Sequence, residues 1–218
     1  MDIESARQNM VDCQIKTWDV FDSAVIEAFR RIKREDFVPL KYKKLAFADT
    51  MLDIGQNQQM MSPKVEARLL QALAIQATDK VLEVGTGTGH LTALLATLAN
   101  KVFSFECDSE LYHFSESNLK TADFKNVHLH LGDGANGCHD FAPYDVIVLS
   151  GSIPARRKSI EEQLIVGGRM FAIIGSGAVM DAVLIKRITE HDWYNEVLFE
   201  TSAEVLEGTK APILFEFT

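Results

Sequence analysis

The residues best suited to chemistry lie in the stretch Glu83-Val84-Gly85-Thr86-Gly87-Thr88-Gly89. An apolar run that predicts a strand precedes it, and a run that predicts a helix follows it. Glycines at such a junction let the backbone turn tightly and let a ligand approach the main-chain N–H groups. Glycines at a strand end also occur as plain turn chemistry, so this stretch needs support from elsewhere in the chain.

Two acids follow the ends of the next two predicted strands. Glu106 closes the second strand, and a carboxylate there can accept hydrogen bonds from both ribose hydroxyls of an adenosine ligand. Asp133, in a Gly-Asp-Gly triplet after the third strand, could accept the exocyclic amine of adenine. Plainer interpretations are a solvated strand end for Glu106 and an ordinary Asp-Gly turn for Asp133. Because open α/β sheets bind ligands at the carboxyl ends of their strands, the coincidence of three such features favours an adenosine site.

The glycine spacing separates two classes of adenosine ligand. Dinucleotide dehydrogenases carry G-x-G-x-x-G, with a helix N-terminus facing the pyrophosphate. This chain reads G-x-G-x-G, with Glu83 two residues before the first glycine. A carboxylate there would repel a pyrophosphate but tolerate a cationic methionyl group. The pattern resembles that of the class I S-adenosylmethionine-dependent methyltransferases.

Within that superfamily, the chain resembles the protein-L-isoaspartate O-methyltransferase family over nearly its whole length. The resemblance implies S-adenosylmethionine as cofactor, S-adenosylhomocysteine as product, and isoaspartyl carboxylates of damaged proteins as acceptors. It also implies a helical front piece that helps to cover the cofactor and the substrate. The stretches that carry it are Arg34-Glu-Asp-Phe-Val-Pro39, Ala46-Phe-Ala-Asp49, Ile54-Gly55 with Gln58 and Pro63, Val81 to Gly89, Gly132-Asp-Gly134, and Gln163-Leu-Ile-Val-Gly-Gly-Arg169.

Carried onto this chain, the resemblance assigns the cofactor contacts residue by residue. The glycine loop is expected to approach the cofactor, and the loop 54–62 is expected to close over the methyl group. The expected contacts are Gln58, Glu83 near the methionyl part, Gly85, Thr86, Gly87 and Gly89 in the glycine loop, Glu106 on the ribose, and Asp133 with Gly134 near the adenine.

The chain departs from the family at the expected catalytic position. The family signature reads like G-x-G-Q-T-I-S-x-P, and its serine is regarded as the active-site residue. Here Met61 stands where that serine is expected, and Gln59 replaces the threonine. Ser62 lies one position later, and its simpler interpretation is the N-cap of a helix that begins at Pro63.

The replacement of the family serine by Met61 affects which acceptor the site can bind. A hydroxyl can orient a carboxylate through a charge-assisted hydrogen bond, whereas a thioether packs and accepts only weakly. Met60 and Met61 could line an adaptable pocket or pack in the core under the loop. The sequence therefore leaves three hypotheses open: isoaspartyl methylation, methylation of a small-molecule hydroxyl or carboxyl, and a cofactor-binding protein without catalysis.

Other polar groups carry weaker signals. The loop 150–154 follows the fourth strand at the usual active-site edge, and it lacks the Asn-Pro-Pro-aromatic signature of nucleic-acid amino-group methyltransferases. The basic run 156–158 could attract an acidic substrate, although a solvated helix start is the plainer interpretation. His128 and His130 share one strand face, but no third ligand stands at metal spacing, so no metal is predicted.

Helix and strand patterns position these residues within an α/β fold. We predict one domain, 1–218, with a helical N-terminal subdomain (1–75) and a Rossmann-like core (76–218) built on a seven-stranded, mainly parallel sheet with helices on both faces. Asp22-Ser23 and Ser62-Pro63 start two predicted helices, and the amide-rich segment 54–61 between them is predicted as a loop. Strands are predicted at 80–84, 101–106, 127–131, 144–149, 168–174, 182–188, 194–200 and 213–217, with a helix at 90–98.

Composition and charge limit the partners. The net charge of −9 argues against a nucleic acid, whose phosphates are bound through clustered Lys and Arg. No apolar run reaches the roughly 20 residues that span a membrane, and no secretory signal is recognised at the N-terminus. The three separate cysteines suggest neither a disulfide framework nor a zinc site. A cytoplasmic protein that acts on a peptide, a protein or a small molecule is expected, and no oligomeric state is predicted.

Overall fold

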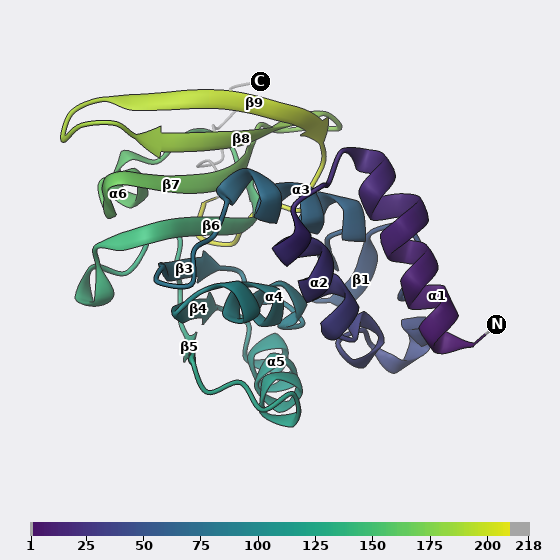
Figure 1. The fold of residues 1–218 in the computed structure, drawn as a ribbon. Helices are drawn as coiled ribbons and strands as arrows, with labels where there is room; N and C mark the ends of the chain where they lie inside the picture. The colour runs from purple at the N-terminus through teal and green to yellow at the C-terminus, as the bar shows by residue number, and fades with distance from the viewer. Residues whose placement is uncertain (1, 210–218) are drawn as a thin grey trace, which may run out of the picture.

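A seven-stranded sheet organises the chain, and the computed structural model describes residues 2–209. The strands run in the order β5-β4-β3-β6-β7-β8-β9, from the bottom to the top of Figure 1. The five strands from β5 to β7 are parallel, and β8 and β9 continue the sheet antiparallel. Their bounds are β3 Lys80–Val84, β4 Lys101–Glu106, β5 Val127–Leu131, β6 Tyr144–Ile153, β7 Leu164–Ile174, β8 Met180–Arg187 and β9 Trp193–Thr201.

These strands confirm the predicted fold class, a Rossmann-like, mainly parallel sheet. The first three predicted strands have the predicted bounds, while β6 extends to Ile153 and β7 begins at Leu164. The last predicted strand, 213–217, lies outside the described residues. Among residues 2–209, no helix is long and apolar enough to cross a membrane.

Side chains alternate between the two faces of the sheet, and each face has its own core. Val81 of β3 packs in the larger cluster with helix α4 (His90–Leu98), whereas Leu82 and Val84 face the other cluster. On that second face lies the short helix α6 (Lys158–Glu161), whose Ile160 is fully buried. Helix α5 (Ser109–Thr121) begins at Asp108, whose carboxylate accepts the N–H groups of Glu110 and Leu111 at 2.9 Å.

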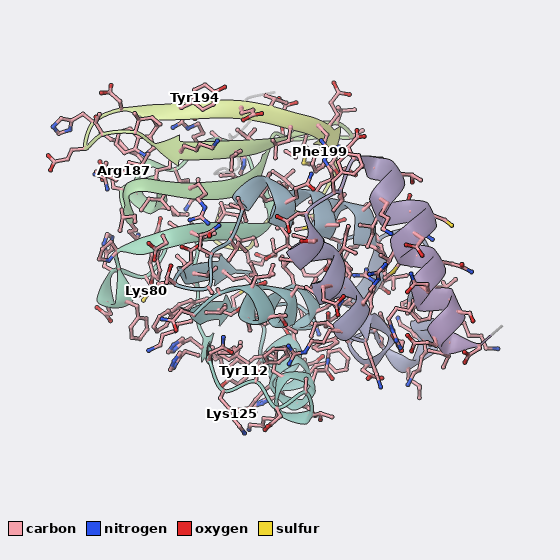
Figure 2. The ribbon with its side chains drawn as sticks, viewed as in Figure 1. Lys80, Tyr112, Lys125, Arg187, Tyr194 and Phe199 are labelled. Carbon is pink, nitrogen blue, oxygen red and sulfur yellow. The ribbon has the colours of Figure 1, made fainter. Side chains whose placement is uncertain are left out.

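The front of the chain lies beside the sheet: Figure 1 shows α1 and β1 beyond the ends of the strands, and α3 packs against β7. Helix α2 begins where predicted, because Asp22 accepts the N–H groups of Ala24 and Val25. Phe199 of β9, labelled in Figure 2, joins this region to the sheet through an edge-on contact with Trp18, with ring centroids 6.2 Å apart. The helical elements are α1 Ile3–Met10, η1 Val11–Ile15, η2 Lys16–Trp18, α2 Ser23–Arg31, η3 Arg34–Asp36, η4 Leu40–Leu45, α3 Pro63–Leu73 and η5 His139–Phe141.

The segment predicted as a loop is a β-hairpin, and this prediction was wrong. Strands β1 (Leu52–Gly55) and β2 (Gln58–Met60) pair antiparallel, with Leu52 opposite Met60. Gln56 and Asn57 connect them with φ of 56° at both residues, as tight two-residue hairpin turns require. Such turns favour Asn and Gly, so a Gln at the first position hid the hairpin from the sequence pattern.

Candidate functional site

A cavity of about 330 Å³ lies at the carboxyl ends of β3 and β4, between the glycine loop and the hairpin. It lies where parallel α/β sheets bind ligands, and its size suits a small cofactor. Gly89, Ser62 and Glu83 do not contribute to its wall. The predicted site residues that do are Gln58, Met61, Gly85, Thr86, Gly87, Glu106, Asp133 and Gly134.

The glycine loop adopts a conformation that other residues resist. Gly85, Gly87 and Gly89 have φ of 93°, 57° and 84°, a region that costs L-residues roughly 1–2 kcal/mol each. Gly89 is the N-cap of α4, so the loop leads directly into the helix. A Cβ at Gly85 would lie 2.9 Å from Leu206, which also lines the cavity. The loop is therefore packed closely against another part of the cavity wall.

Glu106 and Asp133 lie on the cavity wall with acceptor capacity to spare. The two carboxylate oxygens of Glu106 accept the N–H groups of Gly87 at 2.8 Å and Asp108 at 3.1 Å. Oε1 also receives the thiol of Cys107 at 3.8 Å, so Oε2 keeps a free lone pair and Oε1 can exchange this weak donor for a group of a ligand. One oxygen of Asp133 accepts the N–H of Ala135 at 2.8 Å. Both acids can therefore receive donors from a ligand.

Glu83 does not line the cavity, which contradicts the expected contact with the methionyl part. Strand alternation directs its side chain into the core towards α4, where it is fully buried. Its Oε2 accepts the hydroxyls of Thr92 and Ser104, both at 2.6 Å. Burial raises the pKa of Glu83 to about 8, so this acid is mostly protonated at pH 7. Because Ser104 also bonds to Thr86, the network supports the glycine loop from beneath.

At the end of the hairpin, Met61 forms a wall shared by two cavities. Met61 lines the cofactor-sized cavity and also a neighbouring, more open groove of about 430 Å³. Met60 lines only the first of them and packs with Leu52 and Val38 in a small core cluster. These methionines therefore line the pocket and also pack in the core, so both interpretations apply.

Ser62 faces the groove and not the first cavity. It occupies the predicted N-cap position of α3, but its side chain makes no capping hydrogen bond. Lys64, two residues further, forms a salt bridge with Asp49 at 2.8 Å, and its Nζ lies 4.0 Å from the centroid of the Trp18 ring. Lys64, Asp49 and Trp18 all line the groove, so the groove has one cationic side chain beside an acidic and an aromatic one.

Comparison with known proteins identifies the family. A family model described as Protein-L-isoaspartate(D-aspartate) O-methyltransferase (PCMT) matches residues 5–202. The chain belongs to this protein-L-isoaspartate O-methyltransferase family. A curated relative from Marinobacter nauticus, Protein-L-isoaspartate O-methyltransferase 2, is 34% identical and covers 91% of this chain and 93% of its own. The Protein-L-isoaspartate O-methyltransferase of Koribacter versatilis is 37% identical over 83% of this chain and 82% of its own.

Solved structures carry the same fold. A protein-L-isoaspartate O-methyltransferase structure superposes with a TM-score of 0.80 at 25% identity, over 93% of this chain and 66% of the solved one. This chain therefore spans about two thirds of that solved chain. A Plasmodium falciparum protein, solved in complex with S-adenosyl-L-homocysteine, has a TM-score of 0.79 at 17% identity, over 95% of this chain and 99% of its own.

One ion-pair cluster of this family member escaped the sequence patterns. Glu66 of α3 lines the cavity although its exposed fraction is only 1%, and it forms an ion pair with the fully buried Arg34. His90 contacts both oxygens of Glu66 at 3.1 and 3.0 Å, and Arg34 donates to the carbonyl of Met61 at 2.5 Å. In the sequence, Glu66 is an acid near the start of a predicted helix and Arg34 belongs to a stretch that resembles the family. No sequence pattern indicates that the two side chains are in contact.

Ser150 belongs to the segment 150–154 that the sequence placed at the active-site edge, and it directly follows Leu149, the last residue of β6 that pairs with β3. Its hydroxyl is buried, lines the cavity and has no hydrogen-bond partner among the described residues. A Cβ at Gly85 would lie 3.8 Å from this hydroxyl, which places Ser150 beside the glycine loop.

Residues 2–209 contain no group of three or more His, Cys, Asp or Glu side chains arranged to hold a metal ion. His128 instead stacks on Phe103, with ring centroids 5.0 Å apart, and His130 stacks on Phe105 at 4.9 Å. The two histidines therefore take part in ring packing on the sheet.

Proposed function

We propose that this chain transfers a methyl group from S-adenosylmethionine to the carboxylate of isoaspartyl residues in peptides and proteins. The observation that carries the proposal is the position of Met61, which forms a wall of both the cofactor-sized cavity and the open groove. An acceptor in the groove would be adjacent to a cofactor in the cavity. Family membership and the curated relatives that carry this name support the same acceptor.

The residues of the cavity fit this cofactor. When bound, S-adenosylmethionine supplies a methyl group made electrophilic by its sulfonium. Oε2 of Glu106 has a free lone pair and Oε1 holds only a weak thiol donor beside its backbone N–H, so this carboxylate can receive ribose hydroxyls, and Asp133 offers an acceptor for the adenine amine. Apolar side chains from Val84 and Leu111 also line the cavity and can pack against a base.

The protein has to position the acceptor carboxylate and exclude water, because an ionised carboxylate needs no base to become nucleophilic. Met61 cannot donate the hydrogen bond that the family serine is expected to supply. We propose that Ser150 takes this orienting role, since its buried hydroxyl faces the cavity without a partner. We further propose that residues 1–75 act as the cover of the site, because they supply one wall of the cavity and most of the groove.

The free cysteines bear on the proposed cellular compartment, and the acids on the cavity wall bear on the proposed class of acceptor. The described cysteines, Cys13, Cys107 and Cys138, are free thiols, in keeping with a reducing, cytoplasmic setting. Three acids, Glu106, Asp108 and Asp133, line the cavity at the ends of β4 and β5, which disfavours a nucleic acid as acceptor.

The deciding experiment measures methyl transfer from labelled S-adenosylmethionine to an isoaspartyl peptide, with the matching aspartyl peptide as control. We expect base-labile label on the isoaspartyl peptide only. A Met61→Ser variant is measured alongside, and activity in that variant alone would mean that the native site is silent or retuned. Labelling of neither peptide by either protein, with the cofactor still bound, would overturn the proposed acceptor.

Ser150→Ala tests the orienting hydroxyl. We expect kcat/KM for the isoaspartyl peptide to fall about tenfold or more, because a charge-assisted hydrogen bond to the acceptor is lost. Affinity for S-adenosylhomocysteine should not change. Ser152→Ala is the matched control, since the Ser152 hydroxyl is buried outside the cavity and donates to the carbonyl of Ala203 at 3.0 Å. Equal losses in both variants would contradict the role of Ser150.

A small-molecule acceptor is the second candidate, and the apolar wall formed by Met60 and Met61 favours it. Under that alternative, the protein would label a small carboxylic acid or hydroxyl compound and leave both peptides unlabelled. If the protein binds the cofactor and labels no acceptor in either assay, the third hypothesis, a binding protein without catalysis, is supported instead.

A further inference from the structure

We propose that Glu66 binds the α-ammonium group of the methionyl end of the cofactor. The inference deepens the proposed function and rests on its cofactor, although it does not depend on the acceptor. It replaces the role that the sequence had assigned to Glu83. None of the comparisons assigns a role to Glu66.

The geometry of the Glu66 carboxylate leaves room for one more donor. Its Oε2 receives an N–H of Arg34, and Nδ1 of His90 is shared between the two oxygens. A carboxylate offers about four lone-pair sites, so acceptor capacity remains, mainly on Oε1. Glu66 also lines the cavity despite its 1% exposed fraction, so that capacity faces the ligand space.

The cluster around Glu66 keeps a negative charge at the cavity wall. Burial by itself would raise the pKa of Glu66, but the charge of Arg34 and the hydrogen bonds of Arg34 and His90 outweigh burial and lower the pKa. Burial lowers the pKa of His90, which favours its neutral form. The carboxylate is thus ionised and can receive a cation.

The position of Glu66 also separates it from the other acids on the wall. Glu106, Asp108 and Asp133 come from the ends of β4 and β5, where the ribose and adenine are expected, and Glu207 comes from the segment after β9. Glu66 comes from α3, the helix that directly follows Met61. Because the methyl group must face the groove that Met61 borders, the methionyl end lies on the α3 side. Glu83 cannot serve there, since it is buried and mostly protonated.

A structural role for Glu66 is the competing explanation, because Arg34 also donates to the Met61 carbonyl. A purely structural acid would affect all ligands alike. A contact with the α-ammonium would affect only ligands that carry it. The test therefore compares S-adenosylhomocysteine with its desamino analogue, which lacks only that group.

Isothermal titration of both ligands is measured on the native chain and on Glu66→Gln. We expect the native chain to bind S-adenosylhomocysteine about tenfold or more tightly than the desamino analogue. In Glu66→Gln, affinity for S-adenosylhomocysteine should fall by a similar factor, while affinity for the analogue stays nearly constant. Glu35→Gln is the matched control, because Glu35 is a buried partner of Arg7 outside the cavity and should leave the ratio unchanged.

Glu66→Gln leaves Arg34 buried without its partner and can fail to fold. The double variant Arg34→Gln with Glu66→Gln removes both charges, and it should show the same loss of selectivity. Equal affinity of the native chain for both ligands, or an equal loss for both in a folded variant, would overturn the proposal. Absence of any binding of S-adenosylhomocysteine to the native chain would overturn the proposed function itself.

Discussion

Two buried acids in this protein have opposite charge states, although both are almost completely removed from water. Glu83 lies beneath the glycine loop with two hydroxyl partners, Thr92 and Ser104, and burial raises its pKa to about 8. Glu66 lies beneath the hairpin with Arg34 and His90, and its pKa is lowered. The difference teaches that burial alone does not determine the charge of a carboxylate, because a cation within contact distance outweighs it.

The two regions consequently have different tasks. The hydroxyl network under the glycine loop connects β3, β4 and α4 and holds Thr86 in place without a net charge. The ionic cluster under the hairpin connects η3, α3 and α4 and presents an ionised oxygen to the cavity. The first supports the backbone of the site, and the second supplies charge to it.

The largest expected effect comes from the same substitution at the two acids. Glu66→Gln should lower the free energy of unfolding by about 3–5 kcal/mol, because Arg34 is left buried without a counter-charge. Glu83→Gln should cost less than about 1 kcal/mol at pH 7, because the native acid is already mostly neutral. Urea denaturation of both variants measures the difference, and similar costs would remove the distinction between the regions.

The second effect is the pH dependence of stability that Glu83 produces. Its pKa is about 8 in the folded chain and near 4.5 in the unfolded chain, so the folded state binds more protons between these values. Stability from this group is complete below about pH 4.5 and is lost as the pH rises through 8, by at most roughly 1.4 kcal/mol per pH unit.

Glu83→Gln should abolish that loss, so its free energy of unfolding should fall less steeply than that of the native protein from pH 5 to 8. Denaturation curves at several pH values provide the measurement. Parallel curves for the two proteins would show that Glu83 is ionised in the folded state.

A smaller effect is expected from one hydroxyl of the uncharged network. Thr92→Val keeps the shape of the side chain but removes the donor to Glu83, at a cost of about 1 kcal/mol. Because this hydrogen bond lowers the pKa of Glu83, its loss should raise that pKa further. The decline of stability with pH should then extend to higher pH than in the native protein. A decline that ends at lower pH would contradict the assigned direction of the hydrogen bond.

The smallest effect concerns the start of α3, next to the ionic cluster. Ser62→Ala should change the free energy of unfolding by less than about 0.5 kcal/mol, because its side chain makes no capping hydrogen bond. Asp22→Ala, which removes two such bonds at the start of α2, should cost about 1 kcal/mol. Thermal or chemical unfolding of the pair compares them directly, and a larger cost at Ser62 would indicate a cap in solution.

The sequence predicted the core of the fold and named several residues of the cavity wall, because those features depend on local rules. Strand runs, the glycine loop and the acids Glu106 and Asp133 lie within single elements or at their ends, where period and turn chemistry are visible. The hairpin was missed because its turn places Gln56 at positive φ, against the usual preference. Glu83 was misplaced because its neighbours across the sheet and on α4 determine where it points.

The sequence alone thus determined the fold class, the family resemblance and the residues at the strand ends. Only the tertiary structure decided which buried acid carries a charge beside the cavity. Arg34 and Glu66 are separated by 32 positions, and His90 lies 24 positions beyond Glu66, so no local pattern joins them. The physical reason is that a charge in the interior depends on its partners in space, and packing of the front helices against α3 and α4 brings those partners together.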